Sequence, residues 1–311
     1  MIVLGRKYKF TDEELRKLGK KFKTINIVRY RNRSEDEVLE ELQSIAGEEY
    51  FDTLVLNTTA TVGSNIIKYL TTLQFQKRKK PLKIITIEDF MEKYLYKCYI
   101  PDDNTDLRFL SHIKPFNKFE YYVKRIVDYA GIFILFTFSW PIMIYARYKI
   151  KNESPGASIF KQLRVGLNNK EFFCIKFRSM RLDAEANGAK FASKNDDRIF
   201  KWGNIMRQTR IDELPQILNV FKGDMHLIGP RPERKVWTDK FEQVIPYYNE
   251  RHLVRPGITG WAQVMYPYGA NTDDAKQKLM YDLYYIKHWS LWLELKVIYK
   301  TVAVVLGRRG V

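Results

Sequence analysis

The chain is poor in cysteine and histidine. Its 311 residues contain 2 Cys and 4 His. Cys98 and Cys174 lie far apart in sequence and outside any Cys-x-x-Cys spacing, which argues against a disulfide framework or a zinc site and suits a reducing compartment. No two histidines have the spacing of metal ligands. The chemistry of the chain is therefore expected from other residue types.

Negative charge is also scarce. The 36 Asp and Glu residues stand against 53 Lys and Arg, which gives a formal charge of +17. Such a surplus predicts anionic partners, and charge alone does not choose among nucleic acid, phospholipid head groups and phosphorylated substrates. With 45% hydrophobic residues, the chain is long enough to bury a sizeable core, and two domains are expected.

Charged side chains are absent from residues 129–146, YAGIFILFTFSWPIMIYA. As a helix this run would be roughly 27 Å long, close to the thickness of a bilayer's hydrocarbon core. Pro141 removes a helix hydrogen bond and predicts a bend. Basic residues flank both ends, beginning with Lys124 and Arg125, so both ends prefer the cytoplasmic face. We expect a re-entrant membrane helix over 119–150, with an ordinary span and a buried core helix as alternatives.

Residues 1–115 are expected to form a small α/β accessory domain. Strand-like runs at 25–30, 53–56 and 83–87 alternate with helix-like runs at about 34–46, 64–77 and from 88 onward. The sequence from Ser34 to Glu37 predicts a capping box at the start of the first of these helices. This alternation favours a parallel sheet. The glycine pattern of a dinucleotide site is missing, which favours a regulatory or dimerising module. Turn-forming residues between 101 and 119 indicate a linker.

The block 207–232, RQTRIDELPQILNVFKGDMHLIGPRP, carries the strongest functional signal. It places adjacent carboxylates, Asp212 and Glu213, just after Arg207 and before a rigid Gly-Pro-Arg-Pro turn. Guanidinium groups can hold a phosphate, one carboxylate can attack it or exchange protons, and the other can bind a divalent cation. The block therefore predicts chemistry on a phosphate ester.

The carboxylate pair is expected at the start of a helix that ends at Gly223. Asp212 suits the N-cap position and Pro215 the first turn. One apolar face of this helix would consist of Leu214, Ile217, Leu218 and Phe221. The positive helix end would stabilise the Asp212 carboxylate and a phosphoryl group attached to it. A structural N-cap without chemistry is the alternative.

Two further patterns involve cations. Residues that could line an anionic site are Arg164, Lys176, Arg178, Arg198 and Arg207. A solvated basic face is the alternative for each of them. Near the C-terminus, apolar residues from Trp289 to Ile298 alternate with lysines. This alternation predicts an amphipathic helix lying in the membrane interface, and an ordinary core helix is the alternative.

Six motifs occur in order between residues 124 and 296. They are KRIVD at 124–128, KFRSM at 176–180, IDELPQ at 211–216, LIGPRP at 227–232, VRPGITGWAQV at 254–264 and YDLYYIKHWSLWLELK at 281–296. Together they closely resemble the bacterial sugar transferases, the monotopic polyprenyl-phosphate phosphoglycosyl transferases. The resemblance covers about 119–311. It implies an α+β fold whose mainly helical, membrane-associated catalytic domain (151–311) follows the re-entrant helix and a shortened Rossmann-like domain.

The resemblance also implies an activity. Sugar-1-phosphate would move from a UDP-sugar to undecaprenyl phosphate with release of UMP, as the first membrane step of surface glycoconjugate or exopolysaccharide assembly. Asp212 would be the nucleophile that forms a covalent phosphosugar intermediate. Glu213 would bind Mg²⁺ with Asp282 as a second acidic contributor, and Arg207 would hold phosphate.

The implied donor site includes the turn that recognises uridine and the preceding cations. Its residues would be Pro230, Arg231, Pro232, Arg164, Lys176 and Arg178. The implied location is the cytoplasmic face of the bacterial inner membrane. The expected partner is anionic lipid rather than nucleic acid, and a homodimer and a monomer are the two alternatives for the oligomeric state. No motif distinguishes which sugar the donor carries or which polysaccharide or glycoprotein is the final product.

One motif departs from the family pattern. These enzymes usually carry a small residue directly before the proline of the membrane bend, whereas this chain has Ser139-Trp140-Pro141. Ser139 and Pro141 are still expected to form the bend. Two other classes of function remain open on the residues alone: a basic nucleic-acid-binding protein and a non-catalytic membrane scaffold.

Overall fold

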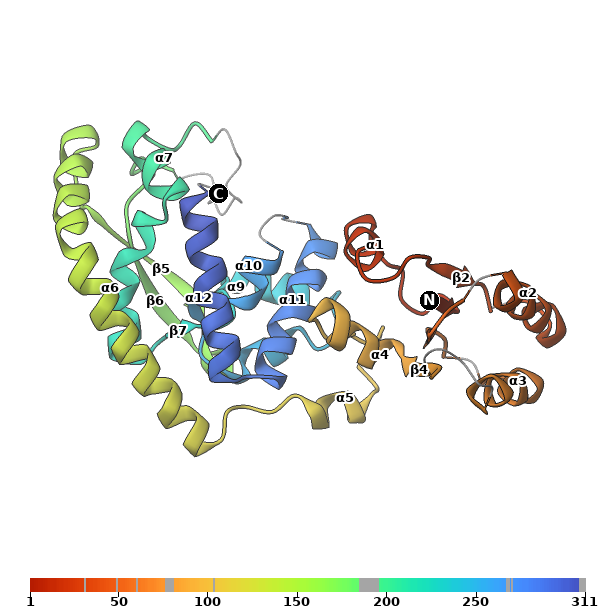
Figure 1. Cartoon of the computed structure of the whole chain (residues 1–311). Coiled ribbons are helices and arrows are strands. Elements are labelled where there is room, and N and C mark those ends of the chain that lie inside the picture. The colour runs from red at the N-terminus through yellow and green to blue at the C-terminus, as the bar shows by residue number, and fades with distance from the viewer. Residues whose placement is uncertain are drawn as a thin grey trace. The chain divides into compact units, whose positions relative to one another are not determined.

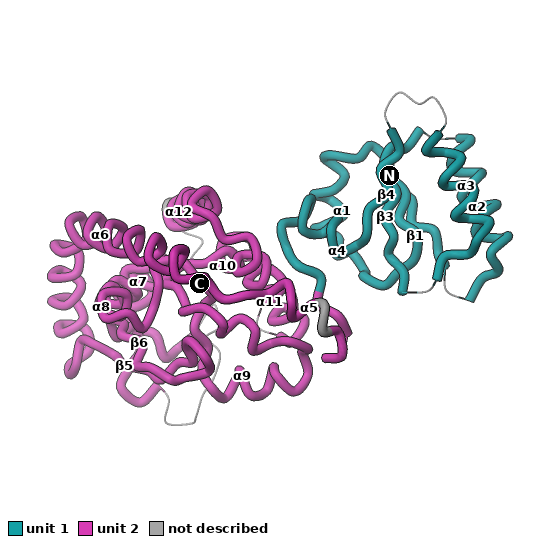
Figure 2. The backbone as a smooth tube through the Cα atoms, turned by 90° about the horizontal axis from the view of Figure 1, so that it is seen from below, with its two compact units in different colours: residues 1–99 teal, residues 100–311 magenta. Residues whose placement is uncertain are grey.

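The computed structural model describes residues 1–30, 32–48, 50–59, 61–75, 81–102, 104–184, 196–266, 269 and 271–307. The chain forms two compact units, Met1–Tyr99 and Ile100–Val311, which Figure 2 shows in teal and magenta. This division falls before the boundary that the sequence suggests near residue 115.

Residues just after the division pack within the second unit. The Asp106 N–H donates to Tyr247 Oη at 2.8 Å, and the Tyr247 N–H donates to Asn104 Oδ1 at 2.9 Å. Helix α5 (Leu107–His112) follows. The segment predicted as a linker is therefore partly helical and in part attached to the unit that it precedes.

A four-stranded parallel sheet forms the centre of the first unit. Its strands are β1 (Ile2–Leu4), β2 (Asn26–Val28), β3 (Thr53–Leu56) and β4 (Lys83–Thr86), in the order β2-β1-β3-β4. Its helices are α1 (Asp12–Gly19), α2 (Glu35–Glu48), α3 (Ser64–Phe75) and α4 (Ile87–Phe90), and the π-helix Met91–Leu95 continues α4. The predicted α/β alternation and the parallel sheet are confirmed.

Local hydrogen bonds explain where these helices begin. The Glu37 N–H donates to Ser34 Oγ at 3.3 Å and the Ser34 N–H donates to Glu37 Oε2 at 3.2 Å, which is the predicted capping box of α2. A second capping box, formed by Thr11 and Glu14, starts α1. The sequence prediction missed β1, because a strand of three residues shows no readable period. It also missed helix α1.

The second unit is mainly helical, with two small sheets. Its longer elements are α6 (Lys118–Glu153), β5 (Ile159–Val165), β6 (Glu171–Phe177), α7 (Lys201–Gln208), α8 (Ile217–Lys222), β7 (His226–Ile228), α9 (Lys235–Glu242), β8 (Gly257–Thr259), α10 (Trp261–Met265), α11 (Thr272–Lys287) and α12 (Leu291–Leu306). Strands β5 and β6 pair antiparallel, and β7 pairs parallel with β8. The 3₁₀ turns are Leu167–Asn169, Ile211–Gln216 and Tyr248–Leu253.

The predicted membrane helix lies within α6. Figure 1 shows α6 as one continuous, bowed helix, which runs through Pro141 without a break. By length and composition it is the one helix among the described residues that could cross a membrane. At 1.5 Å per residue it is about 54 Å long, well beyond the roughly 30 Å of a bilayer's hydrocarbon core.

The two faces of α6 have different surroundings. On one face Ile132 packs in a cluster with Ile217 and Val220, and further along Ala146 and Ile150 pack in a second cluster. On the rest of its surface large apolar side chains are exposed, including Phe119, Phe133, Ile134, Phe136, Phe138, Trp140 and Ile144. The buried core helix is therefore excluded, because most of the apolar surface of α6 is uncovered.

Two basic residues near the N-terminal end of α6, a region called its base below, are buried. Lys124 has no exposed area and Arg125 is 8% exposed. These two residues, which the sequence analysis counts among the basic residues that flank the apolar run, therefore turn into the protein.

Helix α12 is the amphipathic segment predicted near the C-terminus. Leu293 and Val297 are buried, whereas Trp292, Leu295 and Tyr299 are exposed. The Ser290 side chain caps its start by accepting a hydrogen bond from the Leu293 N–H. An exposed apolar face on α12 accompanies the exposed apolar face of α6 in the same unit.

Candidate active site

A cavity of about 770 Å³ lies beside the carboxylate pair. Its lining includes Arg164, Lys176, Arg178, Arg198, Arg207, Asp212, Glu213, Arg231 and Asp282. Residues separated by more than a hundred positions therefore meet at one basic surface. Pro230 and Pro232 are buried beside Arg231 without lining the cavity, and Ser139 and Pro141 belong to α6 rather than to its wall.

Asp212 lies in a 3₁₀ turn and does not cap a helix. The turn Ile211–Gln216 precedes α8, and its N-cap residue is Arg210, whose φ of 60° is unusual for a residue with a side chain. Pro215 has no N–H to donate to Ile211, so an α-helical hydrogen bond cannot form there. The N-cap prediction for Asp212 is wrong, whereas the predicted end at Gly223, with φ 88°, is confirmed.

The apolar face predicted for this helix is only partly correct. Ile217 is buried, but Leu218 and Phe221 are 51% and 65% exposed. Phe221 packs edge-on against Tyr129 of α6, with ring centroids 6.2 Å apart. The exposed side of α8 therefore adjoins α6.

Glu213 is held by three cations. Lys176 Nζ and Arg231 Nη2 each donate to Glu213 Oε1 at 3.0 Å, and Arg210 Nη1 lies 3.5 Å from Glu213 Oε2. Burial alone would raise the pKa of Glu213, but Lys176, Arg231 and Arg210 outweigh it and lower the pKa well below its usual value. Glu213 is therefore ionised throughout the physiological range.

Asp212 has the opposite environment. It is 8% exposed, and its Oδ1 is buried without a hydrogen-bond partner among the described residues. Burial and then the adjacent Glu213 carboxylate raise the pKa of Asp212 to about 6. Its ionised form is less well solvated than an exposed carboxylate, which is the condition of an activated oxygen nucleophile.

Arg207 and Arg164 both line the cavity. The side chain of Arg207, at the end of α7, donates no hydrogen bond to any described residue, and burial lowers its pKa. It can therefore turn its full fork toward an anion. Arg164 donates from Nη1 to Pro232 O at 3.1 Å and lies 3.6 Å from Glu233. Arg164 thus supports the turn that carries Arg231.

Arg178 is committed to the protein. Its Nε donates to Ala157 O and its Nη1 to Ser154 Oγ, each at 2.7 Å, and Nη2 donates to Ser154 O. The guanidinium therefore holds the segment that leaves α6. Its predicted role in substrate binding is not supported by this geometry, although its edge reaches the cavity wall.

Asp282 acts on the cavity through an arginine that the sequence prediction missed. Arg251 Nη2 lies 2.8 Å from Asp282 Oδ2 and donates to Arg231 O at 2.9 Å. Its Nη1 donates to Tyr248 Oη at 2.8 Å. Burial raises the pKa of Asp282 to about 6, against the opposing effect of Arg251. No motif marks Arg251, because it lies just before the VRPGITGWAQV motif that begins at Val254.

Close backbone packing fixes the turn at Arg231. A Cβ on Gly257 would lie 2.0 Å from Gly229 N, so β7 and β8 meet only because both positions are glycine. The Gly257 N–H donates to Pro230 O at 2.9 Å. The turn therefore presents Arg231 from a rigid backbone.

A hard divalent cation fits part of this donor set. Mg²⁺ typically takes one or two carboxylates together with substrate phosphates and water. Among the described residues of the site, Asp212 has an unpartnered oxygen for such a cation. Glu213 is held by three cations and Asp282 is paired with Arg251, so either carboxylate would have to release these partners to bind a metal. Among the described residues, no three Asp, Glu, His or Cys side chains form a protein-only metal cluster.

These features define a class of site. A buried carboxylate pair in a basic cavity, in the same unit as a long exposed apolar helix, suits chemistry on a phosphate ester close to a membrane. Residues 119–308 match the family described as bacterial sugar transferase. This match covers more than half of the chain, so the chain belongs to the bacterial sugar transferase family.

Curated relatives carry related names. The chain is 47% identical over 189 residues, 61% of its length, to UDP-N-acetylgalactosamine-undecaprenyl-phosphate N-acetylgalactosaminephosphotransferase of Aeromonas hydrophila. It is 43% identical over 173 residues, 55% of its length, to UDP-glucose:undecaprenyl-phosphate glucose-1-phosphate transferase of Xanthomonas campestris pv. campestris. The matched regions span 45% and 36% of these relatives, so the chain matches less than half of each.

Proposed function

We propose that this chain transfers sugar-1-phosphate from a UDP-sugar to undecaprenyl phosphate and releases UMP. The observation that carries the proposal is the contrast between two adjacent carboxylates. Asp212 has an oxygen without a hydrogen-bond partner among the described residues and a pKa of about 6, whereas cations around Glu213 lower its pKa well below the usual value. Two adjacent carboxylates in different electrostatic states can take different roles. The names of the relatives supply the substrate class.

The proposed reaction has two displacements. An Asp212 carboxylate oxygen attacks the phosphorus attached to the sugar, the bond from this phosphorus to the UMP oxygen breaks, and UMP leaves. A phosphate oxygen of the lipid then attacks the same phosphorus and displaces the Asp212 carboxylate. The product is a lipid diphosphate sugar, and Asp212 returns unchanged.

The surrounding cations would hold the anions in both steps. Arg207, whose side chain donates no hydrogen bond within the described part of the chain, would bind the phosphoryl group, and Arg231 would bind the donor diphosphate from its rigid turn. Lys176, which donates to the same Glu213 oxygen as Arg231, would neutralise negative charge of the donor diphosphate. A bound Mg²⁺ would supply charge neutralisation of the diphosphate, with Glu213 as its protein ligand and Asp282 as the second acidic group proposed from the family resemblance.

The same proposal includes the membrane. Helix α6 would enter the cytoplasmic face of the bacterial inner membrane and return near Ser139 and Pro141, and the apolar face of α12 would lie in the interface. The exposed apolar surfaces of α6 and α12 support contact with the bilayer. The return near Ser139 and Pro141 rests on the family resemblance, because α6 is continuous through Pro141. The active site would then lie at the level of the lipid phosphate. Anionic lipid would be attracted by the basic surface.

UMP release from a panel of UDP-sugars, with undecaprenyl phosphate and Mg²⁺ in detergent, tests this function. Wild-type protein should release UMP with at least one donor. Asp212→Asn should lower the rate roughly 10³-fold or more, because an amide is a poor nucleophile. The exposed Asp239→Asn is the control. Full activity of Asp212→Asn would refute the mechanism.

A further inference from the structure

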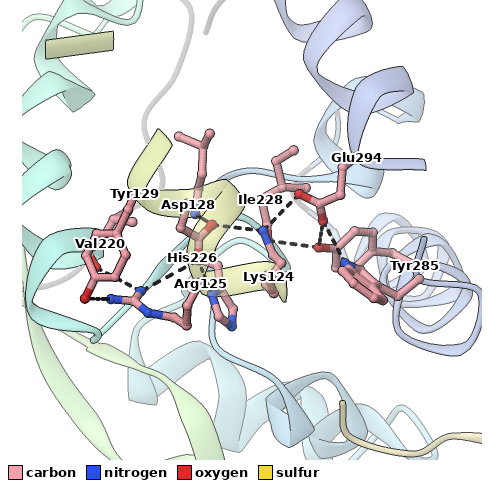
Figure 3. A network of polar contacts seen from close by, with 11 residues as sticks. Lys124, Arg125, Asp128, Tyr129, Val220, His226, Ile228, Tyr285 and Glu294 are labelled. Atoms are coloured by element: carbon pink, nitrogen blue, oxygen red, sulfur yellow. Dashed lines mark hydrogen bonds and ion pairs between the residues drawn. The ribbon is translucent and has the colours of Figure 1, made fainter. Parts of the chain in front are cut away.

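A buried ionic network occupies the base of α6 (Figure 3). Lys124 Nζ donates to Asp128 Oδ1 at 3.0 Å and to Glu294 Oε2 at 2.9 Å. All three side chains are at most 2% exposed. Glu294 belongs to α12, so one lysine joins the two helices that expose apolar faces. An ammonium group buried in this way is stable only while both carboxylates stay in place.

Two branches of this network reach β7, one through Asp128 and one through Glu294 and Tyr285. Asp128 Oδ1 accepts a hydrogen bond from the Leu227 N–H at 2.8 Å. Tyr285 Oη lies 3.0 Å from Ile228 O and also contacts Glu294 Oε1, and its single proton serves one of these acceptors at a time. Both branches therefore end on consecutive residues of β7. The chain runs from this strand directly into the turn that carries Arg231.

The neighbouring Arg125 reaches α8. Its Nη1 donates to Val220 O at 3.0 Å, and its Nη2 donates to Tyr129 Oη at 2.8 Å (Figure 3). Val220 lies near the end of α8, where carbonyl groups carry partial negative charge, and its carbonyl also accepts a hydrogen bond from the Gly223 N–H at 3.1 Å. Helix α8 follows directly after the turn that holds Asp212 and Glu213.

These contacts converge on one pair of active-site groups. The Lys124 branch fixes the strand that leads to Arg231, and the Arg125 branch fixes the helix that leads back to Glu213. Arg231 and Glu213 meet at 3.0 Å. We propose that Lys124 and Arg125 are positioning residues that couple the seating of α6 and α12 to the spacing of Arg231 and Glu213. This inference rests on the proposed function.

The network is also electrically balanced. Two cations, Lys124 and Arg125, face two carboxylates, Asp128 and Glu294, with Arg125 Nη1 3.6 Å from Asp128 Oδ2. His226 Nδ1 contacts Asp128, and burial lowers the pKa of His226 to about 4, so it adds no charge at neutral pH. Lys124 and Arg125 therefore form ion pairs inside the protein and do not contact lipid.

Donor kinetics of matched variants test the inference. Lys124→Met and Arg125→Lys should raise the KM for the UDP-sugar roughly ten- to hundredfold, because a small displacement of Arg231 weakens donor binding. The fraction bound to vesicles of anionic and neutral lipid should not change. Lys118→Met, which removes an exposed cation from the same end of α6, should leave both values unchanged.

Tyr285→Phe keeps every charge of the network and covers the case in which Lys124→Met does not fold. It should raise the donor KM more than it lowers kcat, whereas a variant that only unfolds lowers the active fraction without changing KM. Unchanged donor KM in all folded variants would contradict the inference alone. Loss of vesicle binding with unchanged KM would assign the pair to lipid instead. A wild-type protein without UMP release would contradict the proposed function and this inference with it.

Discussion

The second unit contains two buried clusters of charge that differ in how completely they are paired. At the base of α6, Lys124 bridges Asp128 and Glu294, and each carboxylate has further donors. In the cavity, Glu213 has three cations, whereas Asp212 keeps a buried oxygen without a partner among the described residues. The carboxylates of both clusters are at most 8% exposed, but only the cavity cluster keeps a carboxylate oxygen without a hydrogen-bond partner among the described residues.

This difference separates a structural role from a chemical one. A fully paired buried network resists change, because removing one member leaves the others uncompensated. A partly satisfied carboxylate lowers the stability of the fold and keeps an oxygen available for reaction. Removing a charge should therefore have opposite effects on stability in the two clusters.

The largest effect is expected at Lys124. Lys124→Met should destabilise the protein by about 3–5 kcal/mol, because Asp128 and Glu294 would stay buried without their shared cation. The thermal midpoint, followed by tryptophan fluorescence in one detergent, measures this. Lys118→Met is the matched control at an exposed position. A midpoint for Lys124→Met equal to that of the control would mean that the network carries no stability.

Asp212→Asn should act in the opposite direction. The folded protein raises the pKa of Asp212 to about 6, so the folded state binds the proton more tightly than the unfolded state, and ionisation costs stability as pH rises. The variant should therefore be more stable than wild type by about 1–3 kcal/mol at pH 8. The gain should shrink as pH falls from 6 toward 4.

Thermal midpoints of both proteins between pH 4.5 and pH 8 would show this dependence. Asp239→Asn, on the exposed surface, should show no such change with pH. A destabilised Asp212→Asn at pH 8 would mean that the Asp212 carboxylate is well satisfied in the fold, and the contrast between the two clusters would fail.

The smallest effect is the pH dependence of the rate. Attack requires ionised Asp212, so the rate of UMP release at low donor concentration should fall about tenfold per pH unit below about 6. Glu213 should not contribute, since its pKa lies well below the usual value. A rate that stays constant from pH 7 down to pH 5 would assign the attack to another group.

Local sequence patterns predicted much of the fold. Strands β3 and β4, the capping box at Ser34 and the helix end at Gly223 depend on neighbouring residues and were found within a few positions. The Asp212–Glu213 pair was found for the same reason, together with cations that line the same cavity.

The rest depends on contacts between distant residues. Lys124 and Glu294 are separated by 170 positions, and nothing near Lys124 in sequence indicates that it is buried rather than beside lipid. Arg251 is likewise recognisable only from its contacts with Asp282 and Arg231. The 3₁₀ turn at Asp212 follows from Pro215 and the left-handed Arg210, a conformation that residue type alone does not predict.

The proposed covalent intermediate on Asp212 gives the most direct test of the account. Wild-type protein incubated with its UDP-sugar and Mg²⁺, without undecaprenyl phosphate, should gain the mass of one sugar phosphate on Asp212, which peptide mass spectrometry locates. The adduct should disappear on addition of the lipid phosphate and should be absent from Asp212→Asn. An adduct on another residue, or UMP release that always requires the lipid, would contradict the assignment of Asp212 as nucleophile.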